Sequence, residues 1–256
     1  MKEVHTVVLV QPQERRMSKS RPLVVLTGTA VPQKIGPVRV PELVYPYGGL
    51  NNTVIYHALE NGGRGRLVDT HEEVEDFLVN HIGEECHLIG HSQGVIHALR
   101  FAVDFHQMTQ VVWGLSGPIW GTRWANLAML TPGAAKVIPV IQDFTTRSRY
   151  LAELRLDVAG LFATYDHSLL PSINLVASIN DDFVRPSRSA NLEIDGIHNF
   201  CLGQVRPTAL PEQIGFVRAR IRIALRMTHL SEQIERELLR MMKRSFAGRS
   251  HLGLVA

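Results

Sequence analysis

Seven short runs of apolar, often branched residues recur along the chain and predict the strands of a sheet. They are residues 4–10, 21–28, 41–47, 85–90, 110–117, 171–179 and 191–197. Several of these runs are continuously apolar rather than alternating, which is typical of strands covered on both faces in a parallel sheet. The pattern therefore favours a parallel sheet with helices packed on both sides.

Between these runs, apolar residues recur at spacings of three and four, which predicts amphipathic helices. One such helix covers residues 70–82, and a second follows the run at 85–90 directly, over residues 93–105. On the first helix, the expected buried face consists of Val74, Phe77, Leu78 and His81. Because strands and helices alternate, we expect an α/β fold with a mostly parallel central sheet flanked by helices.

We expect residues 1–256 to form a single domain, because folds of this class commonly reach this length as one unit. The alternation breaks down over residues 119–170, which are too long for an ordinary sheet connection and predict an inserted helical cap or lid. Two crossover helices joined by a long loop are the alternative interpretation. Residues 208–246 are expected to form C-terminal helices.

The composition excludes several classes of protein. With 45% hydrophobic and 20% charged residues, the chain is typical of folded globular proteins rather than disordered or fibrous ones. No stretch approaches the roughly 18 apolar residues that cross a bilayer, and the amino terminus does not resemble a signal peptide. The two cysteines form no disulfide framework. These features predict a cytoplasmic location.

The net charge of +3 is unevenly distributed, since residues 218–256 contain nine Lys or Arg and three Glu. These basic C-terminal helices are a candidate for peripheral contact with an anionic membrane surface, although a solvated helix face is the preferred interpretation. We expect no nucleic-acid partner.

The stretch GHSQG, residues 90–94, lies between a predicted strand and a predicted helix. It fits the pattern G-x-S-x-G of a nucleophile elbow, in which a serine occupies a strained turn at the top of a sheet. Gly90 and Gly94 are required there because side chains at these positions would collide with the tight turn. Ser92 is therefore the candidate nucleophile, and the start of the following helix favours negative charge beside it.

A serine nucleophile needs a base, and the base needs an orienting acid. The chain offers both after Ser92, at the ends of predicted strands, where open α/β sheets assemble their sites. His198, in LEIDGIHNF, is the candidate base. Asp181 and Asp182, in VASINDDFVRP, compete for the acid role, and Asp195 is a weaker candidate because it lies within a predicted strand.

The developing oxyanion needs backbone donors, of which the amide of Gln93 is expected to be one. The loop after the run at 21–28 is expected to supply the other at Thr29, unless it merely ends a strand. The histidine-rich stretch at residues 81–91 could suggest a metal site. On one strand, however, His87 and His91 would lie about 13 Å apart, too far to share an ion, so we expect no metal.

Together these residues resemble the α/β-hydrolase superfamily, and within it triacylglycerol lipases of the Candida antarctica lipase B kind. Four local matches carry the resemblance: LVVLTGT at 23–29, SQG at 92–94, LSGPIWGT at 115–122 and SINDDFVRP at 178–186. The resemblance implies an α/β-hydrolase fold and a catalytic triad of Ser92, Asp181 and His198, with Asp181 rather than Asp182 as the acid. It also implies an oxyanion hole at Thr29 and Gln93. Val95 stands where such lipases often have a third glycine.

The motifs and the resemblance predict a serine hydrolase that cleaves lipid or other acyl carboxylic esters through an acyl-enzyme, without a cofactor. The expected partner is a small-molecule acyl ester. Apolar residues of the insertion would form an acyl-binding wall, although at helical spacing such residues are more often plain core: Trp120, Trp124, Leu127, Met129 and Leu130. The alternatives are a thioesterase or acyltransferase with the same triad, and a non-catalytic hydrolase-fold protein that binds a lipid or a partner.

Overall fold

The computed structural model describes the part of the chain that contains most of the predicted sheet. The described residues are 21–29, 34–35, 38–39, 53–178, 184, 187–202, 240 and 242. The strands predicted at 4–10 and 41–47, the two aspartates at 181 and 182, and all of the predicted C-terminal helices at 208–246 except residues 240 and 242 lie outside them.

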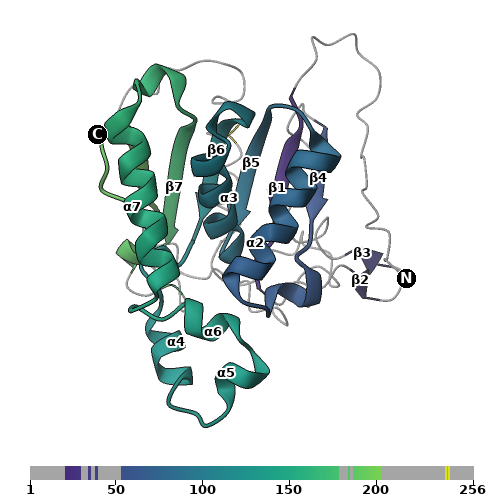
Figure 1. Ribbon diagram of the computed structural model, residues 1–256, viewed down its shortest axis with the longest axis vertical. Coiled ribbons are helices and arrows are strands. Elements are labelled where there is room, and N and C mark those ends of the chain that lie inside the picture. Colours follow the sequence, from purple (N-terminus) through teal and green to yellow (C-terminus); the bar gives the residue numbers. More distant parts are fainter. Residues whose placement is uncertain are drawn as a thin grey trace, which may run out of the picture.

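A six-stranded sheet forms the centre of the structure, with the strand order β4-β1-β5-β6-β7-β8 (Figure 1). Its strands are β1 (Leu23–Leu26), β4 (Val54–His57), β5 (Cys86–His91), β6 (Thr109–Leu115), β7 (Ser172–Ser178) and β8 (Ile197–Leu202). All five pairings within this sheet are parallel. Two short strands, β2 (Lys34–Ile35) and β3 (Val38–Arg39), pair antiparallel with each other. The prediction of a mostly parallel sheet is confirmed.

Three helices lie side by side across one face of the sheet: α2 (Leu67–Asp76), α3 (Gln93–Asp104) and α7 (Arg149–Thr164) (Figure 1). The central helix, α3, contacts both of its neighbours and also β5, β6 and β1. Its apolar side chains are buried in the core that the strands and the other two helices share. Each such side chain stabilises the fold by about 1.5–3 kcal/mol. The start of α3, immediately after Ser92, is therefore held firmly against the sheet.

Four short helical turns of the described chain connect or follow these elements: η2 (Glu60–Gly63), η4 (His106–Met108), η5 (His167–Leu169) and η6 (Ser187–Ala190). Within the described part of the chain, no helix is both long and apolar enough to cross a membrane.

The end of the helix predicted at 70–82 departs from its expected geometry. After α2 the chain continues in a π-helical turn, η3 (Phe77–Ile82), which Gly83 closes by donating to the carbonyl of Leu78 at 3.1 Å. Phe77 and Leu78 are buried as predicted, but His81 is exposed, so its assignment to the buried face is wrong. The wider π-helical turn rotates His81 out of the stripe that regular helical spacing predicts.

The segment predicted as an insertion, residues 119–170, contains two different structures. Its later part includes α7, which packs its apolar side into the core as an ordinary crossover helix between β6 and β7. The earlier part contains the short helices α4 (Arg123–Ala128), α5 (Ala134–Val137) and α6 (Val140–Asp143), which project beyond the carboxyl ends of the strands (Figure 1). We call residues 119–148 the cap. Its two ends are bonded together, since the N–H of Thr122 donates to the carbonyl of Phe144 at 2.8 Å.

The last strand begins later than the apolar pattern predicts. The pattern places a strand at 191–197, whereas β8 starts at Ile197. The main chain of Leu192 is bonded instead to the side chain of Asn199: its N–H donates to Oδ1 at 3.0 Å, and its carbonyl accepts from Nδ2 at 2.6 Å. These bonds satisfy the backbone of Leu192 without a neighbouring strand. The prediction that His198 follows a strand is therefore wrong, because His198 lies inside β8.

Candidate functional site

Ser92 joins β5 to α3 in a strained backbone conformation, with φ 53° and ψ −117°. For a residue other than glycine such a conformation costs about 1–3 kcal/mol and persists only where the surroundings enforce it. Here the Ser92 N–H donates to the carbonyl of Leu115 at 2.9 Å, and the Ser92 carbonyl accepts from the N–H of Val95 at 3.1 Å. Ser92 itself remains partly exposed at the carboxyl edge of the sheet, where the parallel strands end.

The two glycines of the elbow lie where backbones approach each other closely. A Cβ on Gly90 would come within 2.5 Å of the carbonyl oxygen of Gly94, and a Cβ on Gly94 would overlap the carbonyl groups of Leu26 and Thr27. Backbone atoms cannot move aside as a flexible side chain can. The elbow therefore packs directly on the end of β1, beside the loop that carries Thr29.

Thr29 and Gln93, the two residues predicted for the oxyanion hole, are in contact. The Thr29 hydroxyl donates to Oε1 of Gln93 at 2.6 Å. Gln93 is the first residue of α3, and the first N–H groups of a helix have no partner within it. Such donors, together with the helix dipole, favour negative charge at this point.

The motifs do not single out His97, although it contacts the same glutamine. Nε2 of His97 lies 3.3 Å from Nε2 of Gln93, and both side chains are fully buried. The only signal for this contact in the sequence is the four-residue spacing, which places the two side chains on the same face of a helix.

The structure does not bring His198 close to Ser92. Strand register aligns His198 of β8 with Asn174 of β7, Trp113 of β6 and Ile89 of β5. Three strand spacings, roughly 14 Å in total, separate β5 from β8, and Ser92 lies a further three residues along its own strand direction. This separation exceeds the hydrogen-bonding reach of the two side chains. His198 is also exposed.

Asp181 and Asp182 lie outside the described residues, but the chain on either side of them is placed. The strand β7 ends at Ser178, on the carboxyl edge that also carries Ser92. Beyond the aspartates, Val184 is buried and packs with Ala177 and Ala190. The third candidate acid, Asp195, is exposed in the turn before β8.

The cysteine and one histidine of β5 are uncharged at neutral pH. Burial, with a smaller contribution from Glu85 and Glu84, raises the pKa of the Cys86 thiol to about 12, so Cys86 is a poor nucleophile. Burial also lowers the pKa of His87 to about 4. Among the described residues, no group of three or more His, Cys, Asp or Glu side chains is placed to hold a metal ion.

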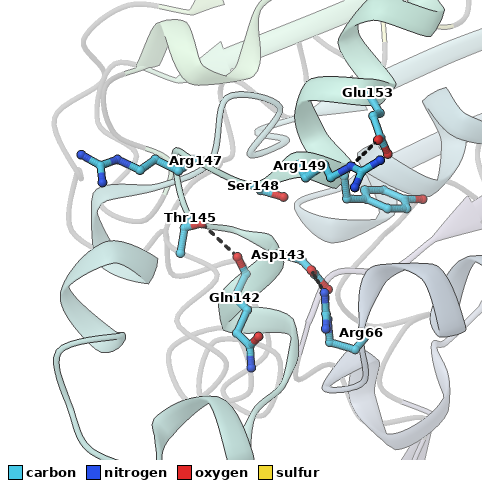
Figure 2. Close-up of a pocket in the computed structure, with 9 residues that line it drawn as sticks. Arg66, Gln142, Asp143, Thr145, Arg147, Ser148, Arg149 and Glu153 are labelled. Carbon is cyan, nitrogen blue, oxygen red and sulfur yellow. Dashed lines mark hydrogen bonds and ion pairs between the residues drawn. The ribbon is translucent and has the colours of Figure 1, made fainter.

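A pocket of about 370 Å³ opens between the cap, α2 and α7 (Figure 2). The charges around it are largely paired. Arg66 donates to both carboxylate oxygens of Asp143, at 2.8 and 2.7 Å, and Arg149 pairs with Glu153 at 2.7 Å. Figure 2 shows Arg147 pointing away from these pairs. Of the predicted catalytic residues, those that the structure describes, Ser92 and His198, do not line the pocket. The Arg66–Asp143 pair joins the cap to the body of the fold, whereas the Arg149–Glu153 pair lies within α7.

Removing the Asp143 side chain should destabilise the protein. Asp143 also accepts a hydrogen bond from the N–H of Leu67, at 2.8 Å, and so caps the start of α2. We expect Asp143→Ala to lower the free energy of unfolding by about 2 kcal/mol, because it removes a buried cap and leaves Arg66 unpaired. Urea denaturation measures this loss. Glu153→Ala is the control, since its pair with Arg149 is exposed to solvent and should contribute little to stability. Equal losses in the two variants would contradict this role of Asp143.

Comparisons with known proteins establish the fold. No protein-family model matches the chain, and the search of curated proteins finds no match. Among solved structures, Aspergillus fumigatus lipase B is similar over 77% of this chain, with a TM-score of 0.54 and 16% identity. The chain has the α/β-hydrolase fold. The match covers 48% of the length of the Aspergillus lipase.

Two further solved structures match the α/β-hydrolase fold of this chain over most of their length. Bacillus licheniformis lipase BlEst2 aligns over 87% of this chain and 96% of its own, with a TM-score of 0.50 and 11% identity. A lipase-esterase related protein from Clostridium acetobutylicum aligns over 87% and 98%, with a TM-score of 0.50 and 12% identity. At these identities the comparisons establish the fold alone, and they confirm the predicted α/β-hydrolase fold.

The α/β-hydrolase core of this chain accommodates Val95, the residue that stands in place of a third glycine. Its side chain packs against Gly114 of β6 and against Gly117, just after that strand. A Cβ on Gly114 would come 2.8 Å from the Val95 side chain, and a Cβ on Gly117 would come 2.5 Å from it. The space that the Val95 side chain needs is thus provided by two glycines on the opposite side.

Proposed function

We propose that the protein is a serine hydrolase that cleaves carboxylic esters through an acyl-enzyme formed on Ser92. The observation that carries this proposal is the backbone of Ser92, held at φ 53° and ψ −117° between β5 and α3. Ser116 also has a positive φ but is buried, whereas Ser92 is partly exposed and directly precedes α3, as the serine of a nucleophile elbow does. Thr29 and Gln93 beside it supply the donors that the reaction needs.

In the proposed reaction, Ser92 Oγ attacks the ester carbonyl carbon while His198 takes its proton and Asp181 orients His198. The negative charge that forms on the carbonyl oxygen is held by the backbone amide of Gln93 and by Thr29. The tetrahedral intermediate then expels the alcohol, to which His198 returns the proton. Water attacks the acyl-enzyme by the same route and releases the acid.

This proposal requires the residues around His198 to leave β8 and reach the carboxyl edge. Within the described sheet, β8 is an edge strand that pairs only with β7. His198 is the second residue of this strand and is exposed, but all six residues of β8 are paired in register with β7, and the neighbouring Asn199 is bonded to the main chain of Leu192. Its release therefore requires the β7–β8 pairing to break, which an edge strand allows more readily than a central strand does.

A second candidate function is the binding of an acyl ester or lipid without cleavage. The separation of His198 from Ser92 favours it, because a serine hydroxyl without a base is a poor nucleophile. The strained, partly exposed Ser92 at the start of α3 favours the hydrolase, because this combination is the arrangement of a nucleophile elbow. We therefore retain the hydrolase as the conclusion.

Labelling with a fluorophosphonate probe, combined with turnover of p-nitrophenyl esters, separates these two functions. The hydrolase should form a covalent adduct, which peptide mass spectrometry should locate on Ser92, and should release p-nitrophenol. A binding protein should take up the ester without either result. Absence of both the adduct and turnover in the purified full chain would contradict the hydrolase.

The cap offers an apolar surface for the acyl part of a substrate. Five large apolar side chains of the cap are between 40% and 77% exposed, so they are not plain core: Trp120, Trp124, Leu127, Met129 and Leu130. They belong to the segment that projects beyond the carboxyl edge (Figure 1). Indole Nε1 of Trp120 donates to the carbonyl of Asn191 at 2.9 Å, and Arg155 lies 4.1 Å from its ring centre. We propose that this surface is the acyl-binding wall and that the substrate is a lipid or other acyl ester.

Polar substitutions on this surface should change the preference for acyl chain length. We expect Leu127→Ser and Leu130→Ser each to lower kcat/KM for a laurate ester about tenfold, because each removes contact area worth roughly 1.5 kcal/mol. The same changes should alter kcat/KM for an acetate ester by less than about twofold. A series of p-nitrophenyl esters from acetate to laurate measures this effect. Leu156→Ser, at a 72% exposed position on α7, is the control. An unchanged chain-length profile would contradict the wall.

The two adjacent aspartates after β7 should differ sharply in their effect on turnover. We expect Asp181→Asn to lower kcat about 10,000-fold, because the base then loses the carboxylate that orients it. Asp182→Asn should leave kcat within about threefold of the original value, since it removes a carboxylate from the neighbouring position only. Ester turnover of the two variants measures the difference. The reverse order of effects would transfer the acid role to Asp182.

A further inference from the structure

The side chain of Gln93 is bonded at both ends inside the protein. The Thr29 hydroxyl donates to its Oε1 at 2.6 Å, and its Nε2 lies 3.3 Å from Nε2 of His97. Gln93 and His97 are fully buried. Gly63 packs against the same amide, because a Cβ at Gly63 would come within 2.5 Å of Oε1. The amide group therefore stays in place, and the one motion open to it is a rotation of about 180° that exchanges the positions of Oε1 and Nε2.

The direction of these hydrogen bonds determines the tautomer of His97. Because the Thr29 hydroxyl donates to Oε1, the NH₂ group of Gln93 faces His97 and donates to its Nε2. Nε2 is then unprotonated, and the ring proton is on Nδ1. Burial, with smaller contributions from His71 and His57, lowers the pKa of His97 well below its ordinary value. The ring is therefore neutral at neutral pH.

In a second arrangement, both hydrogen bonds of the Gln93 side chain run in the opposite direction. With the ring proton on Nε2, His97 donates to Oε1 of Gln93, and the reversed amide donates through its Nε2 to the Thr29 oxygen. The Thr29 hydroxyl then accepts inside the protein, and its own proton is available to an oxygen at the carboxyl edge. The two arrangements thus differ in where the Thr29 proton is donated.

An unpartnered atom reduces the preference for the first arrangement. Nδ1 of His97 is buried and has no hydrogen-bond partner among the residues that the structure describes. In the first arrangement this atom carries the ring proton. Buried N–H groups without an acceptor are rarer in proteins than buried acceptors without a donor. The unsatisfied N–H therefore raises the free energy of the first arrangement and brings it closer to that of the second.

We infer that Gln93 and His97 are positioning residues for Thr29. The site of the proton on His97 sets, through the Gln93 amide, whether the Thr29 hydroxyl donates into the protein or to the oxyanion of the substrate. This inference rests on the proposed ester hydrolysis, in which Thr29 is an oxyanion donor. Molecules that are already in the second arrangement when the substrate binds can donate the Thr29 proton to the negative charge that develops on the substrate oxygen, so no proton has to move on His97 during the reaction.

The tautomer of His97 in the full chain tests this inference without a substrate. Nitrogen-15 shifts of the imidazole distinguish a proton on Nδ1 from one on Nε2. We expect the Nδ1–H form in the original protein and the Nε2–H form in Gln93→Glu, because a carboxylate accepts hydrogen bonds but cannot donate them. Thr29→Val is a milder second variant, which removes the donor to Oε1 and should increase the share of the Nε2–H form. The same tautomer in all three proteins would overturn the inference.

Kinetics show whether this arrangement affects the reaction. In Gln93→Glu the carboxylate keeps the Thr29 proton inside the protein, so kcat should fall about 100-fold while KM changes less than about twofold. When Thr29→Val is already present, adding Gln93→Glu should lower kcat less than about twofold, because no hydroxyl remains to be misdirected. Thr29→Ser retains a hydroxyl and should respond as the original protein does. If Gln93→Glu lowered kcat by the same factor in the original protein and in the Thr29→Val variant, the inference would be overturned.

The two measurements separate this inference from the proposed function. If the chain cleaves esters but the His97 tautomer never changes, the inference fails and the hydrolase remains. If the chain cleaves no ester, the hydrolase fails and the role of Thr29 as an oxyanion donor fails with it, whatever the tautomer does. His87→Leu is the matched control, because it removes another buried, neutral imidazole from the opposite end of β5. It should change neither the His97 tautomer nor kcat.

Discussion

Replacing Ser92 with alanine is expected to lower kcat for ester hydrolysis about a millionfold, the loss that follows removal of a serine nucleophile. What remains is the rate that the oxyanion donors and substrate binding supply without covalent attack. Stability should change by less than about 0.5 kcal/mol, because alanine and serine meet the same backbone strain at φ 53°. Turnover of a p-nitrophenyl ester and urea denaturation measure the two effects.

Ser116 provides a matched control for this experiment. It is a buried serine that also has a positive φ, 51°, and it directly follows the neighbouring strand β6. Ser116→Ala therefore removes a hydroxyl from a similar backbone at the same edge of the sheet, and it should leave kcat unchanged. Activity that survives Ser92→Ala would end the acyl-enzyme proposal.

The second large effect is expected at His198. If the segment around His198 reaches the carboxyl edge, His198→Ala should lower kcat about a millionfold, as loss of the base does in serine hydrolases. The reason is that the Ser92 hydroxyl then has no acceptor for its proton. Ester turnover of the variant measures the loss. His81→Ala, at an exposed position on η3, should retain full activity.

The outcome at His198 also decides whether His198 is the base of the proposed reaction. Full activity in His198→Ala, with Ser92→Ala inactive, would assign the base to another residue. Inactivity of both variants would require the edge strand β8 to release its second residue during turnover. In that case, amides of β8 that are bonded to β7 should exchange hydrogen faster than those of the β6–β7 pairing.

The parts of the fold that the sequence predicts are those with strong local signals. The strands β1, β5, β6 and β7 coincide with continuously apolar runs, and α3 follows directly from the elbow motif. In each of these elements the local pattern and the tertiary environment require the same residues. The pattern also predicts that Thr29 lies near Gln93, because Thr29 follows β1 and Gln93 follows the neighbouring strand β5.

The parts that the sequence does not predict depend on contacts that have no local signal. The strand β4 consists of only four residues, Val54–His57, too short to distinguish from an apolar loop. The start of β8 is set by one side chain, Asn199, which bonds the backbone seven residues earlier. The position of His198 relative to Ser92 follows from that bond, so spacing along the chain does not reveal it.

The cap is fastened at two places, and this determines where its sequence is free to vary. At one place, the backbone and indole N–H groups of Trp120 donate to the carbonyls of Ser189 and Asn191. At the other, Asp143 is bonded to Arg66. Insertions and deletions within residues 129–138 should therefore leave the sheet undisturbed. An insertion adds only the small entropic cost of a longer loop. The length and sequence of this stretch can therefore change while the geometry of the elbow stays the same.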